Sequence, residues 1–122
     1  MEKRTKRQIG KASKARGKRA ELDLVHQLQK FGFAEARRTS QYCGKAGTSD
    51  VVGIPGVHIE CKAVQRLNIW EALSQSERDS KADGNGNGDI PAVFFKRNRT
   101  GFYVAMPLID FVKLYKGEVT NE

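Results

Sequence analysis

The sequence predicts an α/β protein in which helices flank a mixed β-sheet, in the element order αβββαββα. Two observations carry this prediction. Three segments have the start and stop signals of helices, and five short apolar segments are bounded by Gly, Pro, Asn or other turn residues, as strands are. The chain has 122 residues, of which 39% are hydrophobic. That length and composition suit one domain with one core.

The first helix is expected over residues 13–30. Ser13 is a candidate N-cap, and Gly32 ends the helix. The apolar residues of this segment define one face, and they are Leu24, Val25, Leu28 and Phe31. Residues 1–12 are polar and basic, so we expect a flexible N-terminal arm ahead of a single domain over residues 13–122.

Three strands are expected next, over residues 33–39, 50–54 and 57–64. A loop rich in Gly and polar residues, at residues 43–48, precedes the second of them. The second and third strands flank a turn at Ile54-Pro55-Gly56. This part of the chain therefore predicts consecutive strands of one sheet.

The second half of the chain predicts a helix, a hairpin and a last helix. Asn68 can cap a helix that runs to about Lys81, and Glu71 stands three residues on, as a capping box requires. Residues 83–89 alternate Gly with Asp and Asn, which excludes a helix or strand. Residues 92–97 and 101–105 predict the hairpin. Pro107 suits the first turn of the last helix, which Gly117 ends.

The charge of the chain is concentrated at one end. The net charge is +8, and residues 1–19 carry all of it, with nine Lys or Arg residues against Glu2. The remaining residues hold 13 basic and 13 acidic groups. A neutral domain with a basic arm favours a polyanionic partner, most simply nucleic acid. A solvated tail and a nuclear-import signal are the alternatives.

Several classes of protein are excluded by the same composition. The longest apolar runs, such as residues 92–95, are too short to span a membrane. No apolar stretch follows the basic N-terminus, so we expect no secretory signal peptide and a cytoplasmic location. Cys43 and Cys61, with two histidines, match no zinc module. A disulfide is not expected in a reducing compartment.

Glu21 lies where an unpaired charge is unfavourable. At about 100° per residue, it falls roughly 40° from Val25 and roughly 20° from Leu28 on the first helix. A carboxylate on an apolar stripe is paired, coordinates a cation or is protonated. The alternative is a residue at the edge of the helix whose side chain bends to solvent.

Alternation divides the strand at residues 57–63 into two faces. The core face holds Val57, Ile59, Cys61 and Ala63, and the other face holds His58, Glu60 and Lys62. We interpret Cys61 as a core residue rather than a nucleophile, and His58 as a surface residue rather than a base. Glu60 and Lys62 alone are typical of a solvated edge. Asp50, which opens the preceding strand, is the neighbour that would make them a site.

These residues stand in a recognisable order. Asp50, followed after nine residues by Glu60-Cys61-Lys62, resembles the PD-(D/E)XK nuclease signature. The segment at residues 17–21 (Gly-Lys-Arg-Ala-Glu) resembles the helix-one motif of archaeal-type Holliday junction resolvases, and similar proteins occur in phages. Residues 49–53 and 59–62 look like the two catalytic strands of those resolvases. The resemblance covers about residues 13–112, although Ser49 stands where the motif name has Pro.

The turn between the two strands decides whether Asp50 and Glu60 share a face. A two-residue turn at Pro55-Gly56 would pair Asp50 with Cys61, on the wrong face. A three-residue loop with Gly56 in the left-handed region, or a bulge at Gly53, would place Asp50 opposite Glu60. We expect one of these two arrangements.

The resemblance implies a restriction-endonuclease-like core and a metal-dependent endodeoxyribonuclease. Three nearby carboxylates repel one another unless a cation joins them, and Mg²⁺ is the usual ion beside phosphates. By resemblance, Asp50 and Glu60 bind Mg²⁺, Glu21 and the Cys61 backbone carbonyl complete its shell, and Mn²⁺ substitutes for it. Lys62 would then orient the attacking water and stabilise charge on the phosphate.

Other residues are candidate contacts to DNA or to a second subunit. The basic candidates for phosphate contacts are Lys11, Lys14, Arg16, Lys18, Arg19, Arg37, Arg38, Lys96, Arg97 and Arg99. By resemblance, Gln75 on the second helix faces the active site, and a solvated position is the alternative. Trp70 and the Phe residues are interpreted as core or dimer interface. A four-way junction is two-fold symmetric and needs two symmetric cuts, so the resemblance implies a homodimer.

Two other functions stay open at this point. A nuclease of DNA repair, restriction or packaging could share these four residues, and recombination and phage genome processing are both compatible with them. A non-catalytic basic module that binds RNA or ribosomes would explain the arm. It would not explain Glu21 on an apolar stripe or three acids in motif order, because acids repel phosphate.

Overall fold

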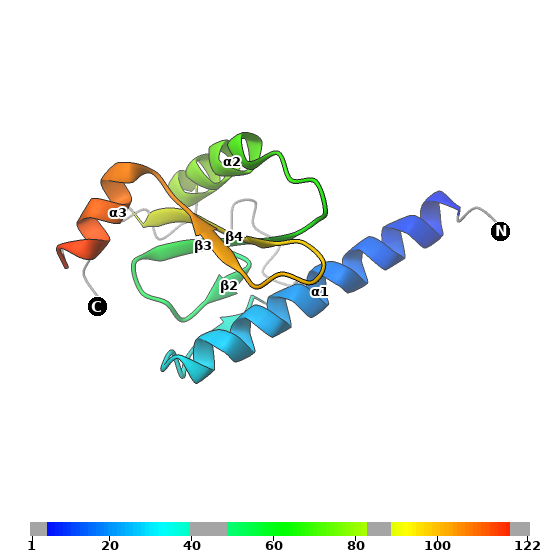
Figure 1. The fold of residues 1–122 in the computed structure, drawn as a ribbon, viewed down its shortest axis with the longest axis horizontal. Coiled ribbons are helices and arrows are strands. Elements are labelled where there is room, and N and C mark those ends of the chain that lie inside the picture. The colour runs from blue at the N-terminus through cyan, green and yellow to red at the C-terminus, as the bar shows by residue number, and fades with distance from the viewer. Residues whose placement is uncertain (1–4, 40–48, 83–88, 118–122) are drawn as a thin grey trace.

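The computed structural model describes residues 5–39, 49–82 and 89–117. Over these residues the chain is an α/β protein with three helices and one five-stranded mixed sheet (Figure 1). The predicted element order αβββαββα is confirmed. The loop predicted at residues 43–48 and most of the Gly-rich run, at residues 83–88, lie outside the described residues.

The first helix, α1 (Lys6–Lys30), is longer than the sequence analysis predicts. It begins after Thr5, whose side chain accepts a hydrogen bond from the Gln8 backbone N–H, while the Gln8 side chain accepts one from the Thr5 N–H. The prediction of a helix start at Ser13 and a flexible arm is therefore wrong for residues 6–12, which are helical. The reason is local, since a Thr followed three residues later by Gln is a capping box.

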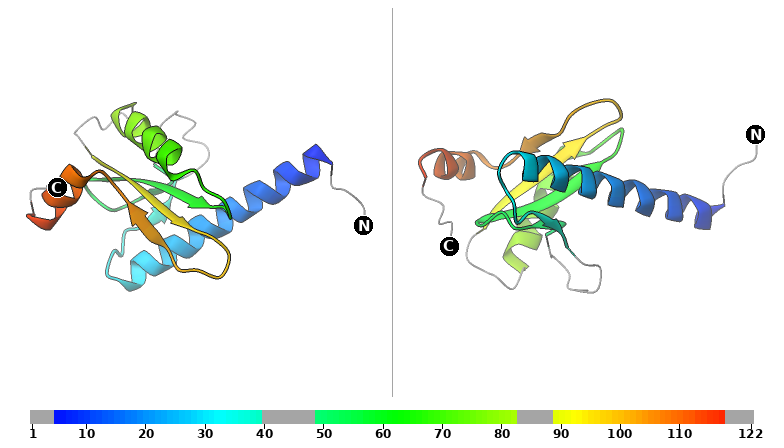
Figure 2. Two further views of the ribbon diagram at one scale, coloured as in Figure 1. Left: turned by 45° about the horizontal axis from the view of Figure 1, so that its top comes forward. Right: turned by 90° about the horizontal axis from the view of Figure 1, so that it is seen from below.

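The N-terminal half of α1 extends away from the body of the molecule (Figures 1 and 2). Residues of α1 become buried only from Ala20 onward. The extended part therefore has almost no packing against the sheet, and its basic side chains face solvent. It is a basic helix where the sequence predicts a flexible tail.

The sheet consists of β1 (Arg37–Arg38), β2 (Val51–Val52), β3 (Val57–Ala63), β4 (Ile90–Lys96) and β5 (Tyr103–Ala105), in that spatial order. β1, β2 and β3 are antiparallel neighbours, β4 lies parallel to β3, and β5 returns antiparallel to β4. The strand predicted at residues 33–39 is only two residues long in the structure, where it is β1. Turns occupy the preceding segment, where the Phe33 N–H donates to the Leu28 carbonyl and the Ala36 N–H to the Phe33 carbonyl.

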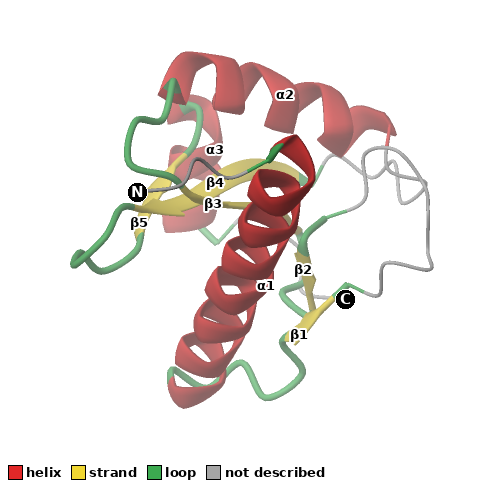
Figure 3. Cartoon of the chain, turned by 90° about the vertical axis from the view of Figure 1, so that its right-hand side faces the viewer, coloured by secondary structure: helices red, strands yellow, loops and turns green. Residues whose placement is uncertain are grey.

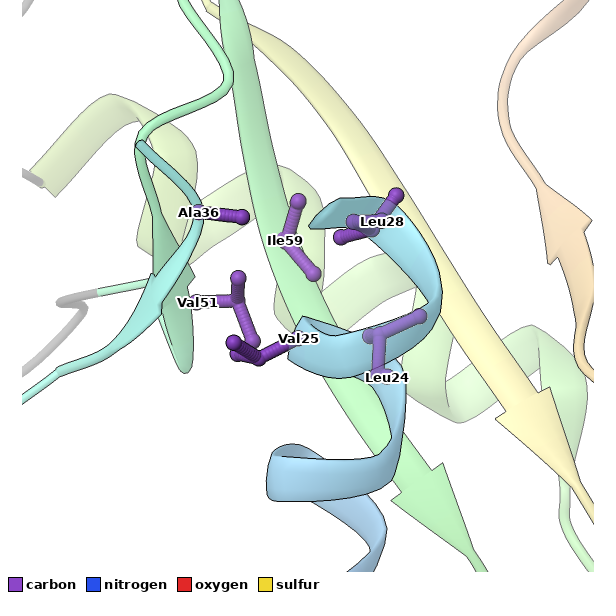
Figure 4. Packing of buried hydrophobic residues seen from close by; sticks show 6 residues of the cluster. All are labelled: Leu24, Val25, Leu28, Ala36, Val51 and Ile59. Atoms are coloured by element: carbon purple, nitrogen blue, oxygen red, sulfur yellow. The ribbon is translucent and has the colours of Figure 1, made fainter. Parts of the chain in front are cut away.

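Helices cover the two faces of this sheet (Figure 3). On one face α1 packs its apolar stripe on β2 and β3, and the buried cluster there is Leu24, Val25, Leu28, Ala36, Val51 and Ile59 (Figure 4). On the other face lies α2 (Ile69–Ala82), which contacts β3 and β4. The buried residues of α2 are small, namely Ala72, Ser76 and Ser80, so the helix can lie close to the sheet.

The predicted Asn68 cap is present, whereas Pro107, predicted in the first turn of the last helix, is its N-cap and makes no side-chain cap hydrogen bond. The Asn68 side chain accepts a hydrogen bond from the Glu71 N–H at 3.1 Å, at the start of α2. The last helix, α3 (Leu108–Tyr115), follows Pro107, and Gly117 stands beyond its end with a φ of +72°. None of the residues of α3 is buried. Within the described ranges, no helix is long and apolar enough to cross a membrane.

Candidate active site

Asp50 lies beside Glu60 at the start of β2. Val51 pairs with Ile59, the Asp50 N–H donates to the Ile59 carbonyl, and the Asp50 and Glu60 carboxyl groups are close enough to act on each other. The connecting turn has Gly56 at a φ of +84° and Gly53 at +98°. The loop is therefore the expected three-residue one with a left-handed Gly56, and Gly53 adds a second left-handed residue.

Gly53 is required by close backbone packing as well as by its φ angle. A Cβ atom added at this position would clash with the backbone carbonyl of Glu35. Only glycine therefore lets the segment before β1 lie directly against the turn after β2.

Ser49 anchors the start of β2. Its hydroxyl accepts a hydrogen bond from the Ile59 N–H at 3.0 Å, and the next residue, Asp50, donates its own N–H to the Ile59 carbonyl at 2.8 Å. The Ser49 carbonyl in turn accepts a hydrogen bond from the Thr39 hydroxyl. The residue that departs from the nuclease motif is thus buried and holds Asp50 in register. A proline at this position could not supply the hydroxyl.

Asp50 and Glu60 form a crowded pair of carboxylates. The Asp50 Oδ2 accepts a hydrogen bond from the Cys61 N–H at 2.8 Å, and Glu60 is buried. Burial, together with the neighbouring Glu60 carboxylate, raises the pKa of Asp50 to about 6, although the Cys61 N–H and the Lys62 charge act to lower it. Two acids that share a partly buried site in this way favour a bound proton or a bound cation.

Glu21 reaches the same region from α1 and is held by an arginine. The Arg38 Nε lies 2.6 Å from the Glu21 Oε1, and each side chain is about one fifth exposed. Burial raises the pKa of Glu21, and the hydrogen bond from Arg38 opposes that rise. The charges of Asp50 and Lys62 are close enough to act on the same pKa. Arg38, a sequence candidate for phosphate contact, thus lies inside the carboxylate site.

His58 is a site residue that sequence reasoning missed. Its side chain is completely buried, and its Nε2 lies 3.0 Å from the Glu60 Oε1. The interpretation of His58 as a surface residue is wrong, because α2 covers the face of β3 to which it belongs. Alternation in the sequence indicates that His58 and Glu60 share a face, but it does not indicate what packs over that face.

Cys61 is not a nucleophile in this structure. It is a free thiol whose side chain packs beside the α1 core cluster. Burial and then the negative charges of Asp50 and Glu21 raise the pKa of the thiol to about 12. The interpretation of Cys61 as a core residue is therefore supported. Cys43 lies outside the described residues.

The carboxylates fit a magnesium ion that takes few protein ligands. The described part of the chain has no group of three His, Cys, Asp or Glu side chains placed to hold a metal ion. Glu21 forms an ion pair with Arg38 instead. Mg²⁺ is commonly bound by one or two carboxylates, with water and phosphate oxygens in its remaining positions. Asp50 and Glu60 meet that requirement, and the mutual repulsion that raises the pKa of Asp50 would be relieved by a cation.

Apart from Arg38, the basic candidates lie on the helical arm, at the turn between β4 and β5, or singly on β1 and β4. The helical arm carries five of them, which are Lys11, Lys14, Arg16, Lys18 and Arg19. Arg97 and Arg99 are exposed at the turn between β4 and β5. Arg37 is exposed and donates to the Glu35 carbonyl at 3.2 Å, whereas Lys96 lies 3.8 Å from Asp23 and over the Phe102 ring.

Two further candidates differ in their surroundings. Gln75 is half-buried on α2, and its side chain makes no hydrogen bond within the described part of the chain. Trp70 is 77% exposed at the start of α2, so it is not a core residue.

Comparison of the chain with protein-family models, with curated proteins and with solved structures found no match.

Proposed function

We propose that this chain is a metal-dependent endodeoxyribonuclease that cuts four-way DNA junctions. The observation that carries the proposal is the convergence of Asp50 and Glu60, with Asp50 at a pKa of about 6 and Lys62 close enough to lower it. A fold stabilises such a crowded acidic pair poorly, so the pair is more readily explained by function. The order of Glu21, Asp50, Glu60 and Lys62 along the chain adds the resemblance to junction resolvases.

Each residue has a role that follows from its place. Asp50 and Glu60 would hold Mg²⁺, which supplies charge stabilisation at the phosphate and a more acidic water when bound. Lys62, two residues beyond Glu60 on the same face of β3, would hold the attacking water and balance negative charge that develops on the phosphate. His58 would orient the Glu60 carboxylate, and Arg38 would keep Glu21 ionised beside the site.

The basic helical arm supports DNA as the substrate. Residues 6–19 of α1 carry seven Lys or Arg residues and no acid. Contacts from such a surface to phosphates position DNA without reading its sequence. The arm extends away from the body of the molecule (Figure 2), so it could reach phosphates beyond the one that is cut.

A homodimer through α3 completes the proposal. The apolar residues of this helix that are exposed are Leu108, Ile109, Phe111, Leu114 and Tyr115. An antiparallel contact between two copies of α3 would place Asp110 opposite the partner's Lys113, so the charges match where the apolar side chains meet. In Figure 1, α3 lies on the side opposite the free end of the arm, so two arms would point outward from the dimer.

The proposal is tested by cleavage of a synthetic four-way junction and a matched linear duplex, in Mg²⁺ or in EDTA, on a denaturing gel. We expect paired symmetric cuts in the junction, only with Mg²⁺. Asp50→Asn and Lys62→Ala should abolish cutting while DNA binding is kept or tightened. Glu77→Gln, which removes an exposed acid on α2, is the matched control.

Each other outcome has a definite meaning. Cutting of junction and duplex alike would keep the nuclease and replace junction specificity with a repair or restriction type of activity. Binding without cutting in any divalent ion would overturn the nuclease and favour a basic nucleic-acid-binding module. Cutting that survives both Asp50→Asn and Lys62→Ala would place the active site elsewhere.

A further inference from the structure

We infer that the pocket beside Lys62 binds an unstacked nucleobase next to the phosphate that is cut. The inference rests on the proposed nuclease function and adds a feature of the substrate to it. The pocket has a volume of about 380 Å³ and lies at the carboxyl ends of β3 and β4. Its lining includes Val64, Phe95, Arg97 and Tyr103.

Sheet register places this pocket on the catalytic face. Lys62 pairs with Phe95 across β3 and β4, and Phe95 pairs with Tyr103 across β4 and β5. Directly paired residues share a face, and neighbouring strands are about 4.8 Å apart. The three side chains therefore form one row across the sheet, on the same face as Glu60. A phosphate bound at Lys62 would place the adjacent nucleotide over the rings of Phe95 and Tyr103.

The chemistry of the pocket suits a nucleotide. The rings of Phe95 and Tyr103 lie 6.0 Å apart between centroids and are tilted by 30°, and Tyr103 is 62% exposed. An exposed aromatic surface beside cations is the usual platform for single-stranded bases, because every base has a π face and carries a phosphate. Arg97, which lines the pocket and is exposed, supplies that charge. An apolar protein partner would leave this cation to be desolvated.

A base in this pocket has a consequence for substrate choice. In a linear duplex each base is stacked on both sides, so its entry would require unstacking and unpairing. In an open four-way junction, the base pairs at the branch point are stacked on one side only. The pocket therefore favours branched DNA over duplex at the point of cutting, and Tyr103 acts as a specificity residue rather than a catalytic one.

The test uses the full chain bound in EDTA, so that no cutting occurs, to a four-way junction with 2-aminopurine placed at each nucleotide beside the branch point. We expect one position where the fluorescence of the bound probe rises several-fold on Tyr103→Ala, because the base loses its stacking partner. We expect Tyr103→Ala to weaken junction affinity about 10-fold and duplex affinity less than 2-fold. Tyr103→Phe, which keeps the ring, should behave as wild type.

Phe31→Ala is the matched control, since Phe31 is an aromatic residue 79% exposed at the far end of α1. The inference is overturned if Tyr103→Ala leaves fluorescence and affinity unchanged at every position. It is also overturned if Tyr103→Ala changes the oligomeric state alone, since the face would then be a protein interface. If the wild type cuts no DNA in any divalent ion, the proposed function fails, whereas the fluorescence result still decides whether the pocket takes a base.

Discussion

At the scale of single residues, the site consists of groups held in unfavourable surroundings by their neighbours. Asp50 sits against Glu60 with its pKa raised to about 6, and Glu60 is held by a completely buried histidine. Glu21 is kept close to a second acid by its ion pair with Arg38. Such groups reduce the stability of the fold in exchange for reactivity, so substitutions that remove function should raise stability.

The first residue-scale prediction concerns Asp50 and pH. Because its folded pKa of about 6 lies above 3.8, the ordinary pKa of an aspartate, the protonated form favours the folded state. In EDTA, Asp50 should therefore add stability as the pH falls through 6, reaching about 3 kcal/mol only below the unfolded pKa of 3.8, and this gain is lost as the pH rises again. Urea unfolding of the wild type and of Asp50→Asn across this pH range measures the difference.

Asp50→Asn should make the protein more stable than the wild type at pH 7 and remove this part of the pH dependence. Mg²⁺ should stabilise the wild type at pH 7 and leave the variant unaffected, because a cation relieves the same repulsion. Equal stability of the two proteins at pH 7 would show that Asp50 and Glu60 do not repel each other in solution.

The second residue-scale prediction concerns His58. A carboxylate only accepts hydrogen bonds, so the His58 Nε2 carries the hydrogen that orients the Glu60 Oε1. Loss of a group that orients a metal ligand typically costs about 10- to 100-fold in metal affinity. We expect this loss of Mn²⁺ affinity, measured by calorimetry, for His58→Leu and a partial recovery for His58→Gln, which keeps a nitrogen donor.

His26→Leu is the control for this measurement, because His26 is exposed on α1. A role in packing alone would give the same Mn²⁺ affinity for His58→Leu and His58→Gln once both variants are shown to be folded. Unchanged affinity in His58→Leu would mean that Glu60 needs no orienting group.

At the scale of elements, short local features place the strands that carry the carboxylates. The turn after β2 combines two left-handed glycines, and the Ser49 hydroxyl takes the place of a backbone group in the pairing with β3. The long α1 has two parts, one that packs on the sheet and one that carries charge. Each device can be altered without touching the carboxylates.

Gly53→Ala tests the turn. Its positive φ and the clash with the Glu35 carbonyl should together lower the free energy of unfolding by about 2–4 kcal/mol. Gly10→Ala is the control, since Gly10 is helical with open space around it, and it should raise stability by up to about 1 kcal/mol. Urea denaturation measures both. Equal effects of the two changes would mean that the turn relaxes freely.

Deletion of residues 1–12 tests the arm. The deletion removes five Lys or Arg residues. Each phosphate contact contributes about 0.9 to the slope of log affinity against log salt, so the slope should become shallower by up to about 4.5. Lys81→Ala, which removes one exposed charge far along the chain, should change the slope by less than about 1. An unchanged slope in the deletion would show that residues 1–12 make no phosphate contact and that any contact of the arm comes from residues 14–19.

At the scale of the whole molecule, the sheet separates two surfaces of different character. The basic arm extends on one side, and the exposed apolar residues of α3 lie on the other (Figure 1). A monomer rarely leaves a helix of this composition wholly uncovered. Under the proposed function, the charged surface would contact DNA and the apolar surface a second copy, which would match the symmetry of a four-way junction.

Ile109→Lys tests the dimer. Ile109 is 61% exposed on α3, so a lysine there should leave the fold intact and convert a dimer to a monomer in sedimentation equilibrium. Junction cutting should then lose its paired symmetry while single nicks persist. Ile9→Lys is the control, since Ile9 is 51% exposed on the arm and should leave the mass unchanged. A wild-type chain that sediments as a monomer at all concentrations would remove the α3 interface from the proposal.

The sequence by itself determined the order of the elements and the cap of α2, and it predicted that Asp50 and Glu60 lie close together. These features depend on hydrogen bonds and alternation within a few residues, and such signals are complete in a short segment. The start of α1 was also within reach, because Thr5 and Gln8 form a local capping box.

Only the tertiary structure decided what lies over and against those residues. His58 is buried because α2 covers its face, Arg38 meets Glu21 because β1 passes beside α1, and Ser49 matters because its hydroxyl reaches Ile59. The Ser49 and Arg38 contacts join residues ten or more positions apart, and α2, which buries His58, begins eleven residues beyond it. Patterns along a strand or helix indicate which face a residue occupies, and packing between elements decides whether that face meets water, a helix or another charge.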